Sequence, residues 1–449
     1  MNKKIKNFLI FIVFFLVLGC SFDKRSGIWS GSEEERERLS RLKKDLENRE
    51  IYNVYSSQNE YSEEIAATKK VELIKANKNM LWEMPNFNLQ NNLGNFYLSG
   101  VEDNFLKKKV GKNKFSISKV MAPPLLTEEY VIFSDDVGTI FNMTKQGKVK
   151  WKKNIYKKIY KKIYKNLSLY IHESKVFAVD NIGFIYSLNL ETGEIIWIKN
   201  LKIPIKSHIK IHSDKIFVVN QENRILCLDI KNGKKIWDIR TVTSFIKLQN
   251  YLGLAVSEQG DLIVLSSSGD LFRLKTKNGL IYWSVNATGS LFAHDTDFFK
   301  SSEIALNGED IIFSASNSTF SYDLASGYVN WRKDIPSVGT PIVNGENVFL
   351  VTQNGYFVNL DRKTGEIIWS TNTFKNLKKK KRLTNVTGYV MGSEKIYIST
   401  LNGNLIICSA SSGEVQSIKK IGDTITAPPV ISDGSIFLLT EDSRILGFR

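Results

Sequence analysis

The side chains that carry most enzyme chemistry are scarce in this 449-residue sequence. It has three cysteines and four histidines, and these do not form a cluster with the spacing of a metal site. A phosphate-binding glycine loop, an HExxH motif and a Ser-His-Asp arrangement are also missing from the sequence. We therefore predict no catalytic residue, no bound metal and no cofactor.

Cys20 is the one cysteine whose setting predicts a modification. It follows a lysine-rich start and an apolar run from Phe8 to Leu18, which is typical of the signal peptide of an exported protein. The run is too short for a transmembrane helix. The stretch 16–20, Leu-Val-Leu-Gly-Cys, ends at this cysteine.

That stretch resembles the lipobox of bacterial lipoproteins. The resemblance implies cleavage after residue 19 and attachment of lipid to the sulfur and the new amino group of Cys20. Several acyl chains on one residue would hold the protein at a membrane. Ser21 follows in place of the Asp that retains lipoproteins at the inner membrane, so an outer-membrane location is implied. We expect the periplasmic face, and a surface-exposed position is the alternative.

An eleven-residue pattern that occurs seven times predicts the fold. Two copies are SLNLETGEIIW (187–197) and NLDRKTGEIIW (359–369), and successive copies end 38 to 48 residues apart. That spacing is about the length of one four-stranded blade of a β-propeller. Each copy has glycine at its seventh position, namely Gly147, Gly193, Gly233, Gly279, Gly327, Gly365 and Gly413. Six copies end in tryptophan, namely Trp151, Trp197, Trp237, Trp283, Trp331 and Trp369.

Each copy reads as a β-hairpin. A strand end leads into a polar turn, glycine takes a positive φ there, and a second strand carries the tryptophan near its start. A large indole that recurs at one position of every blade is expected to pack between neighbouring blades. We interpret these tryptophans as structural rather than catalytic.

The count of blades is eight. Residues 426–449 begin one more repeat, but the sequence ends one strand short of a complete blade. An open blade would expose a strand edge, so the missing strand should come from the segment before the first repeat. We predict an all-β, eight-bladed β-propeller whose last blade is completed by an N-terminal strand, with 114–118 as that strand. Seven blades is the alternative.

The remaining sequence is assigned by composition. We predict a signal peptide at 1–19, a flexible tether at 20–31, a charged helical extension at 32–79, an irregular connection at 80–112 and the propeller at 113–449. Ser32 and Glu35 form a capping box, and the extension forms either one or two surface helices or a partly ordered arm. Cys227 and Cys408 fall on opposite sides of such a ring and are expected to be buried, unpaired residues.

The net charge of +16 favours acidic partners or anionic lipids in general. Much of the excess lies in lysine runs such as 378–382, which are typical of solvated loops. No module that combines aromatic and basic residues for nucleic-acid binding accompanies them. We predict no nucleic-acid partner.

The repeats resemble the tryptophan-docking repeats of pyrroloquinoline-quinone dehydrogenases. That resemblance implies a vicinal Cys-Cys pair over the quinone and a calcium-binding set beside a catalytic Asp. The sequence has no Cys-Cys pair and no counterpart of the calcium set. A quinone-dependent enzyme is therefore disfavoured.

The lipobox, the tether and the eight repeats together resemble the BamB family of outer-membrane assembly lipoproteins. In that family an Asp-x-Asp pair after an Ala-Thr-Gly-Ser loop contacts the barrel subunit BamA. Here Asp295 and Asp297 supply such a pair, displaced toward the N-terminus, after Ala-Thr-Gly-Ser at 287–290, and Phe292 lies beside them. The family's preceding inter-blade loop has an apolar-x-apolar-Arg contact, and Phe245, Ile246 and Lys247 are the corresponding residues, without the Arg.

The resemblance implies a non-enzymatic, lipid-anchored scaffold of the outer-membrane β-barrel assembly machinery. Its partners would be a BamA-like barrel subunit and other assembly lipoproteins, with the propeller monomeric inside a hetero-complex. The alternatives are a surface-exposed or periplasmic ligand-binding lipoprotein and, less favoured, a quinone-dependent dehydrogenase.

Overall fold

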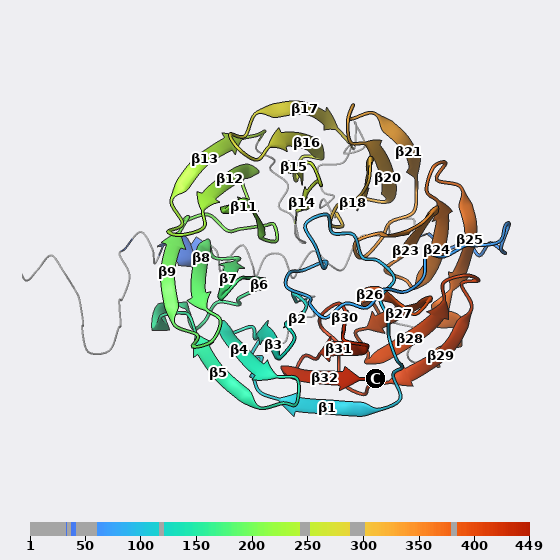
Figure 1. Cartoon of the computed structure of the whole chain (residues 1–449), viewed down its shortest axis with the longest axis horizontal. Coiled ribbons are helices and arrows are strands. Elements are labelled where there is room, and N and C mark those ends of the chain that lie inside the picture. Colours follow the sequence, from blue (N-terminus) through green and yellow to red (C-terminus); the bar gives the residue numbers. More distant parts are fainter. Residues whose placement is uncertain are drawn as a thin grey trace, which may run out of the picture. The chain divides into compact units, whose positions relative to one another are not determined.

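Eight four-stranded antiparallel sheets form a closed ring of blades (Figure 1). This is a computed structural model, and it describes residues 33, 37–41, 61–115, 121–242, 252–287, 301–378 and 384–449. The eight-bladed β-propeller expected from the repeats is confirmed, and the seven-bladed alternative is wrong.

In blades 1 to 7 the strand nearest the ring axis comes first in the sequence and the outermost strand last, whereas blade 8 takes its outermost strand from an earlier part of the chain. Blades 1 and 2 contain β2 (Leu125–Leu126), β3 (Tyr130–Ser134), β4 (Thr139–Thr144), β5 (Val149–Asn154), β6 (Leu167–His172), β7 (Lys175–Asp180), β8 (Phe184–Asn189) and β9 (Ile195–Asn200). Blades 3 and 4 contain β10 (Lys210–His212), β11 (Lys215–Val219), β12 (Arg224–Asp229), β13 (Lys235–Arg240), β14 (Leu254–Val256), β15 (Asp261–Leu265), β16 (Asp270–Lys275) and β17 (Ile281–Asn286). Blades 5 and 6 contain β18 (Ala305–Asn307), β19 (Asp310–Ala315), β20 (Ser318–Asp323), β21 (Val329–Lys333), β22 (Ile342–Asn344), β23 (Asn347–Val351), β24 (Tyr356–Asp361) and β25 (Ile367–Asn372). Blades 7 and 8 contain β26 (Val386–Gly392), β27 (Lys395–Thr400), β28 (Asn404–Ser409), β29 (Val415–Lys420), β30 (Val430–Ser432), β31 (Ser435–Leu439), β32 (Arg444–Phe448) and β1 (Asn104–Lys109).

The described residues also contain two 3-10 helices, η2 (Lys158–Tyr160) and η4 (Thr373–Asn376). By its internal contacts the chain divides into a unit of residues 1–58 with 154–164 and a unit of residues 59–153 with 165–449, which contains the ring. In the first unit, residues 37–41 are helical and Arg41 pairs with Glu37 one turn away. No helix in the described part of the chain is both long enough and apolar enough to cross a membrane.

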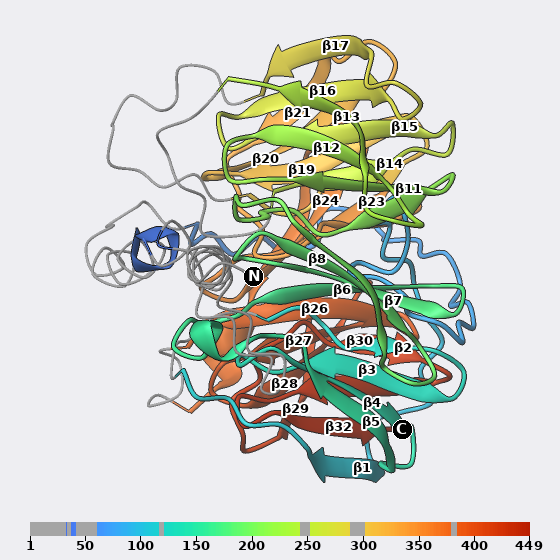
Figure 2. The same ribbon diagram turned by 90° about the vertical axis from the view of Figure 1, so that its left-hand side faces the viewer.

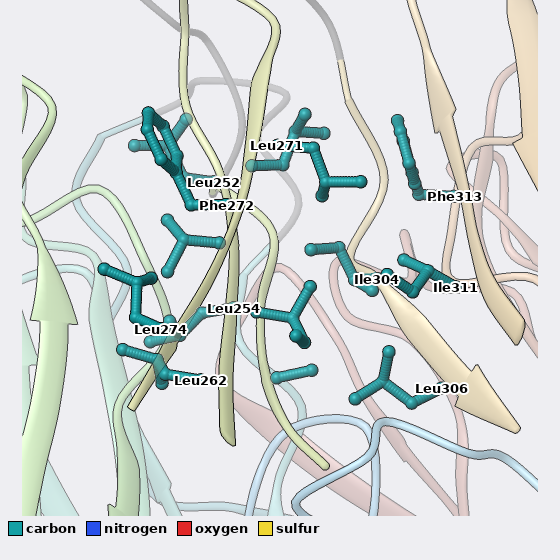
Figure 3. Close-up of a cluster of buried hydrophobic side chains, with 14 of the residues drawn as sticks. Leu252, Leu254, Leu262, Leu271, Phe272, Leu274, Ile304, Leu306, Ile311 and Phe313 are labelled. Atoms are coloured by element: carbon teal, nitrogen blue, oxygen red, sulfur yellow. The ribbon is translucent and has the colours of Figure 1, made fainter. Parts of the chain in front are cut away.

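Inner and outer strands have different side-chain patterns because they have different surroundings. The second strand of each blade is buried on both faces, and β11, for example, is almost entirely apolar and buried. The outermost strand faces water, and β9 accordingly alternates between exposed and half-buried residues. The core lies between adjacent blades: Leu254 and Leu271 of blade 4 face Ile304 and Phe313 of blade 5 (Figure 3).

Each repeat tryptophan lies against the repeat glycine of the following blade. A Cβ atom added to Gly193 would lie 2.6 Å from Cδ2 of Trp151, so any other residue would displace the ring. Gly193 also has φ +71°, which only glycine adopts without strain. The same contact joins Trp197 to Gly233, and it continues around the ring in the pairs Trp237–Gly279, Trp283–Gly327, Trp331–Gly365 and Trp369–Gly413.

The indole N–H of the tryptophan makes a second link between blades. Trp151 Nε1 donates to the main-chain oxygen of Leu190, three residues before Gly193, at 2.8 Å. The equivalent bond recurs from Trp197, Trp237, Trp283 and Trp331 to the residue three before each following glycine. Trp369 is the exception, since its Nε1 is buried with no hydrogen-bond partner.

The ring closes through β1, which pairs with β32 as the outermost strand of blade 8. An N-terminal closing strand is therefore confirmed, but its predicted position at 114–118 is wrong. The strand lies inside 80–112, which the sequence assigned to an irregular connection. Its sequence, NFLKKK, does not alternate clearly because an outermost strand buries little: only Leu106 is buried. Leu106 lies 3.1 Å from the Cβ position of Gly147, where other blades use tryptophan.

Residues 61–79 are extended, so the predicted helix over 32–79 is wrong in this part. Their composition favours helix, but pairing with distant strands takes precedence. Ile65 forms an antiparallel bridge with Ser370 of β25, and Asn77 bridges Phe96. Cys227 and Cys408 are buried and free, as predicted.

We predict that Gly365→Ala destabilises the ring more than Gly308→Ala. Both glycines have positive φ, +69° at Gly365 and +60° at Gly308, so both substitutions cost about 1 kcal/mol for a left-handed alanine. At Gly365 the new Cβ would also lie 2.6 Å from Trp331, which adds about 1–3 kcal/mol of overpacking, whereas at Gly308 nothing lies within 4 Å. Urea unfolding of both variants measures the difference. Equal free energies of unfolding would contradict the tryptophan–glycine contact as the main link between blades.

Candidate functional site

The residues predicted to contact a partner belong to two connections that flank blade 4. Phe245, Ile246 and Lys247 lie between β13 and β14, and Phe292, Asp295 and Asp297 lie between β17 and β18. All six, like Cys20, are outside the described residues. β13 and β17 are outermost strands, and each is followed by the innermost strand of the next blade, so the described ends of both connections lie on the same face of the ring.

The described end of the first connection is held by a buried asparagine. Asn223 donates from Nδ2 to the main-chain oxygen of Val242 at 3.1 Å. Its Oδ1 accepts from the main-chain N–H and the hydroxyl of Ser267, at 3.0 and 2.8 Å. Asn223 therefore ties blade 3, blade 4 and the start of the connection together. Val242 itself is 69% exposed, an apolar side chain beside the predicted contact.

The described start of the second connection is also fixed. Ala287 donates its main-chain N–H to Gly269 of blade 4 at 2.8 Å and accepts from the Tyr322 hydroxyl of blade 5 at 3.3 Å. Two neighbouring blades therefore hold this point. Hydrogen bonds therefore hold the described ends of both connections beside blade 4, and the six predicted residues stay a prediction.

The opposite face of the ring is covered by residues 77–99, which we call the axial segment. The axial segment contacts the last residues of innermost strands, such as Asn307 of β18 and Gly392 of β26. The two connections precede the first residues of innermost strands, which lie at the other face of the ring. Figures 1 and 2 show this segment crossing the ring centre at one face. Its main chain bonds to six blades, through Trp82–Leu126, Glu83–Ile171, Leu89–Val256, Gln90–Leu306, Phe96–Ser393 and Ser99–Gly434. The other two blades are reached through the side-chain contacts Lys210–Asn88 and Thr340–Asn86.

A buried polar cluster lies where the axial segment meets blades 2 to 5. Lys210 Nζ donates to the main-chain oxygen of Asn88 at 2.8 Å and to Oδ1 of Asn91 at 2.5 Å. Asn91 Nδ2 in turn donates to the main-chain oxygens of Leu254 and Ile304, at 3.0 and 2.8 Å. These hydrogen bonds stabilise the cluster, because burying the same polar groups without partners would cost a large amount of free energy.

Burial also determines the charge states in this cluster. It lowers the pKa of Lys210 and raises the pKa of Glu303, and the attraction between the two groups opposes both shifts. His208 lies between Ser168 Oγ, 2.7 Å from Nδ1, and Glu303 Oε1, 3.7 Å from Nε2. Burial, with a smaller contribution from Lys210, lowers the pKa of His208 to about 3. The imidazole is therefore neutral at physiological pH.

Sequence reasoning missed both the axial segment and this cluster. A lysine, a histidine and a glutamate in separate repeats give no local signal, because only the closed ring brings them together. Among the described residues, no group of three or more His, Cys, Asp and Glu side chains is placed to hold a metal ion.

The fold defines the class of the protein, an eight-bladed propeller of tryptophan-docked repeats. The chain belongs to the family described as outer membrane protein assembly factor BamB, whose model matches residues 145–371, just over half of the chain. The family resemblance noted from the sequence is thus confirmed.

Curated relatives are distant. BamB of Escherichia coli K12 is 22% identical over 190 residues, which cover 41% of this chain and 47% of the relative. BamB of Xanthomonas campestris pv. campestris is 25% identical over 137 residues, which cover 30% and 32%. The chain thus spans about half the length, or less, of these relatives.

Solved structures share the fold. BamB from Moraxella catarrhalis matches with a TM-score of 0.62 and 15% identity, over 77% of this chain and all of that one. A europium-containing methanol dehydrogenase matches with a TM-score of 0.58 and 11% identity, over 80% and 89%. At these identities the likeness concerns the fold alone.

We predict that His208→Gln makes stability less sensitive to acid. Between pH 6.5 and about 3 the unfolded chain binds a proton that folded His208 does not, so stability falls as pH falls. This one group should contribute about 1.4 kcal/mol per pH unit below 6.5. Glutamine keeps an acceptor for Ser168 but has no such proton.

Urea unfolding at pH 8, 6 and 5 measures the effect, with each protein compared with its own value at pH 8. Parallel pH profiles for wild type and variant would contradict a buried neutral imidazole at this position.

Proposed function

We propose that this protein is a non-enzymatic, lipid-anchored scaffold of the outer-membrane β-barrel assembly machinery. It is held at the outer membrane through Cys20, on the periplasmic face, and binds a BamA-like barrel subunit beside other assembly lipoproteins. The β13–β14 and β17–β18 connections provide the contact. The observation that carries the proposal is membership of the BamB family, because its description names outer-membrane protein assembly.

The framework around blade 4 supports this assignment physically. The described ends of both connections lie on one face, and hydrogen bonds from Asn223 and Tyr322 fix them. A partner surface on rigid supports loses less conformational entropy on binding than one on a free loop. Phe245 and Phe292 would supply apolar anchors, with Asp295 and Asp297 as charged neighbours.

Partner recovery tests the proposal. The lipoprotein is purified from crosslinked membranes as wild type, as Phe245→Ala with Asp295→Lys, and as Glu414→Lys. Glu414 is an exposed residue in the repeat turn of blade 7, so its substitution reproduces the charge change away from the connections. We expect wild type and Glu414→Lys to recover a BamA-like barrel, and the double variant to recover at least tenfold less, since a lost apolar anchor and a reversed charge each cost about 1–2 kcal/mol. Absence of the barrel from the wild-type sample would refute the function, and equal recovery by the double variant would refute the site.

The dehydrogenase-like fold leaves a second function to test. A solved europium-containing methanol dehydrogenase and a quinohemoprotein alcohol dehydrogenase from Pseudomonas putida share this fold. The vicinal Cys-Cys pair that the dehydrogenase resemblance implies is missing from this sequence. Reconstitution with pyrroloquinoline quinone and calcium should give no dye reduction with alcohols; turnover would replace the scaffold proposal with an enzyme.

A further inference from the structure

The outermost strands of the eight blades differ in charge, and two of them stand apart. Six contain at least one lysine or arginine, which protects an exposed strand edge from pairing with other chains. Only β25 and β17 have no charged residue. Their sequences also correspond position by position, IIWSTN in β25 and IYWSVN in β17.

The edge of β25 is covered by residues 61–69 of the same chain, which we call the docked segment (Figure 1). Ile65 and Ser370 exchange two main-chain hydrogen bonds, at 3.0 and 2.9 Å, and Thr68 donates to Ile368 at 2.9 Å. Ile368 is consequently only 1% exposed. This blade shows that an uncharged outermost strand of this ring accepts an extended segment.

The edge of β17 has the same register and no such cover among the described residues. Ser284 faces Phe272 of β16 as Ser370 faces Val358 of β24, so the main-chain N–H of Ser284 points outward like that of Ser370. Within the described part of the chain, β17 pairs only with β16. Ile281 and Tyr282, which correspond to Ile367 and Ile368, are 41% and 48% exposed.

Two ion pairs hold the docked segment to blade 6, Lys375 with Glu64 and Asp361 with Lys69, and the second indicates what would bind at β17. Asp361 is the last residue of β24, and it pairs with Lys69 of the docked segment. The corresponding residue of blade 4 is Lys275, which is exposed. A segment bound at β17 should therefore resemble the docked segment in its apolar and small residues, but have an acidic residue in place of Lys69.

We propose that β17 is a docking site for an extended peptide segment of a partner protein, which adds to blade 4 as a fifth strand. The segment carries an apolar residue at the position of Ile65 and a carboxylate facing Lys275. A lipid surface is the other partner that suits exposed Ile281 and Tyr282. A lipid surface would leave the main-chain N–H and C=O groups along the edge of β17 without hydrogen-bond partners, whereas a peptide strand would pair with them. This site is independent of the proposed function.

Two peptides probe the site on the full-length lipoprotein in detergent. One has the sequence of residues 61–70, and the other has Glu in place of Lys69. Fluorescence anisotropy measures their dissociation constants. We expect the Glu peptide to bind wild type about fivefold more tightly than the native peptide, the effect of one exposed charge pair, and Lys275→Asp to reverse that order.

Ser284→Pro removes the outward N–H that would bond the peptide and should weaken binding about tenfold. The fold should survive, because this N–H takes no part in the pairing with β16. Lys152→Pro is the matched control, since Lys152 follows Trp151 in β5 as Ser284 follows Trp283, and it should bind the peptide like wild type. If Ser284→Pro does not fold by circular dichroism, Tyr282→Lys places a charge on the same edge and should also abolish binding.

Three results would overturn the site: neither peptide binds wild type, the proline variant binds as well as its control, or Lys275→Asp keeps the wild-type order. Sedimentation with phosphatidylglycerol vesicles completes the test. If wild type binds neither peptide but binds vesicles, and Tyr282→Lys removes the vesicle binding, the edge of β17 is a lipid contact instead.

Discussion

The packing of a tryptophan indole against the glycine of the next blade is the constraint on which this ring depends. The indole needs a neighbour without a side chain, and the glycine also needs a positive φ to turn the hairpin that presents it. Each of blades 1 to 6 therefore fixes the position of the next one. The contact recurs six times, and at the closing blade Leu106 of β1 takes the place of the indole against Gly147. Closure thus needs a strand from far away in the sequence, but not another tryptophan.

The N-terminal part of the ring-forming unit supports the ring in three ways. The docked segment covers one outer edge, the axial segment bonds to the inner strands, and β1 completes blade 8. Each uses main-chain hydrogen bonds, which depend little on side-chain identity. A segment with no repeat and no strand-like alternation is therefore as much a part of the propeller as the repeats are. It also seals one face of the ring, where Lys210 and Glu303 are buried beneath it.

Differences between the blades carry what is specific to this protein. The repeats give every blade the same framework, so contact with a partner depends on the connections around blade 4 and on outermost strands that lack charge. Sequence shared with the BamB family supports a role in outer-membrane protein assembly, while the tryptophan–glycine contacts would serve any propeller of this kind. The same distinction explains why a dehydrogenase can share the fold at 11% identity.

The sequence by itself predicted eight blades and an N-terminal closing strand, because Gly and Trp recur every 38 to 48 residues and each Trp packs on the Gly of the next repeat. It also indicated the family and the connections where a partner is proposed to bind. Only the tertiary structure decided that β1 is Asn104–Lys109, that residues 61–79 are extended despite a helix-favouring composition, and that Lys210 lies near His208 and Glu303. Main-chain pairing between distant segments overrides local propensity, and a side chain's burial depends on which blades the closed ring brings together.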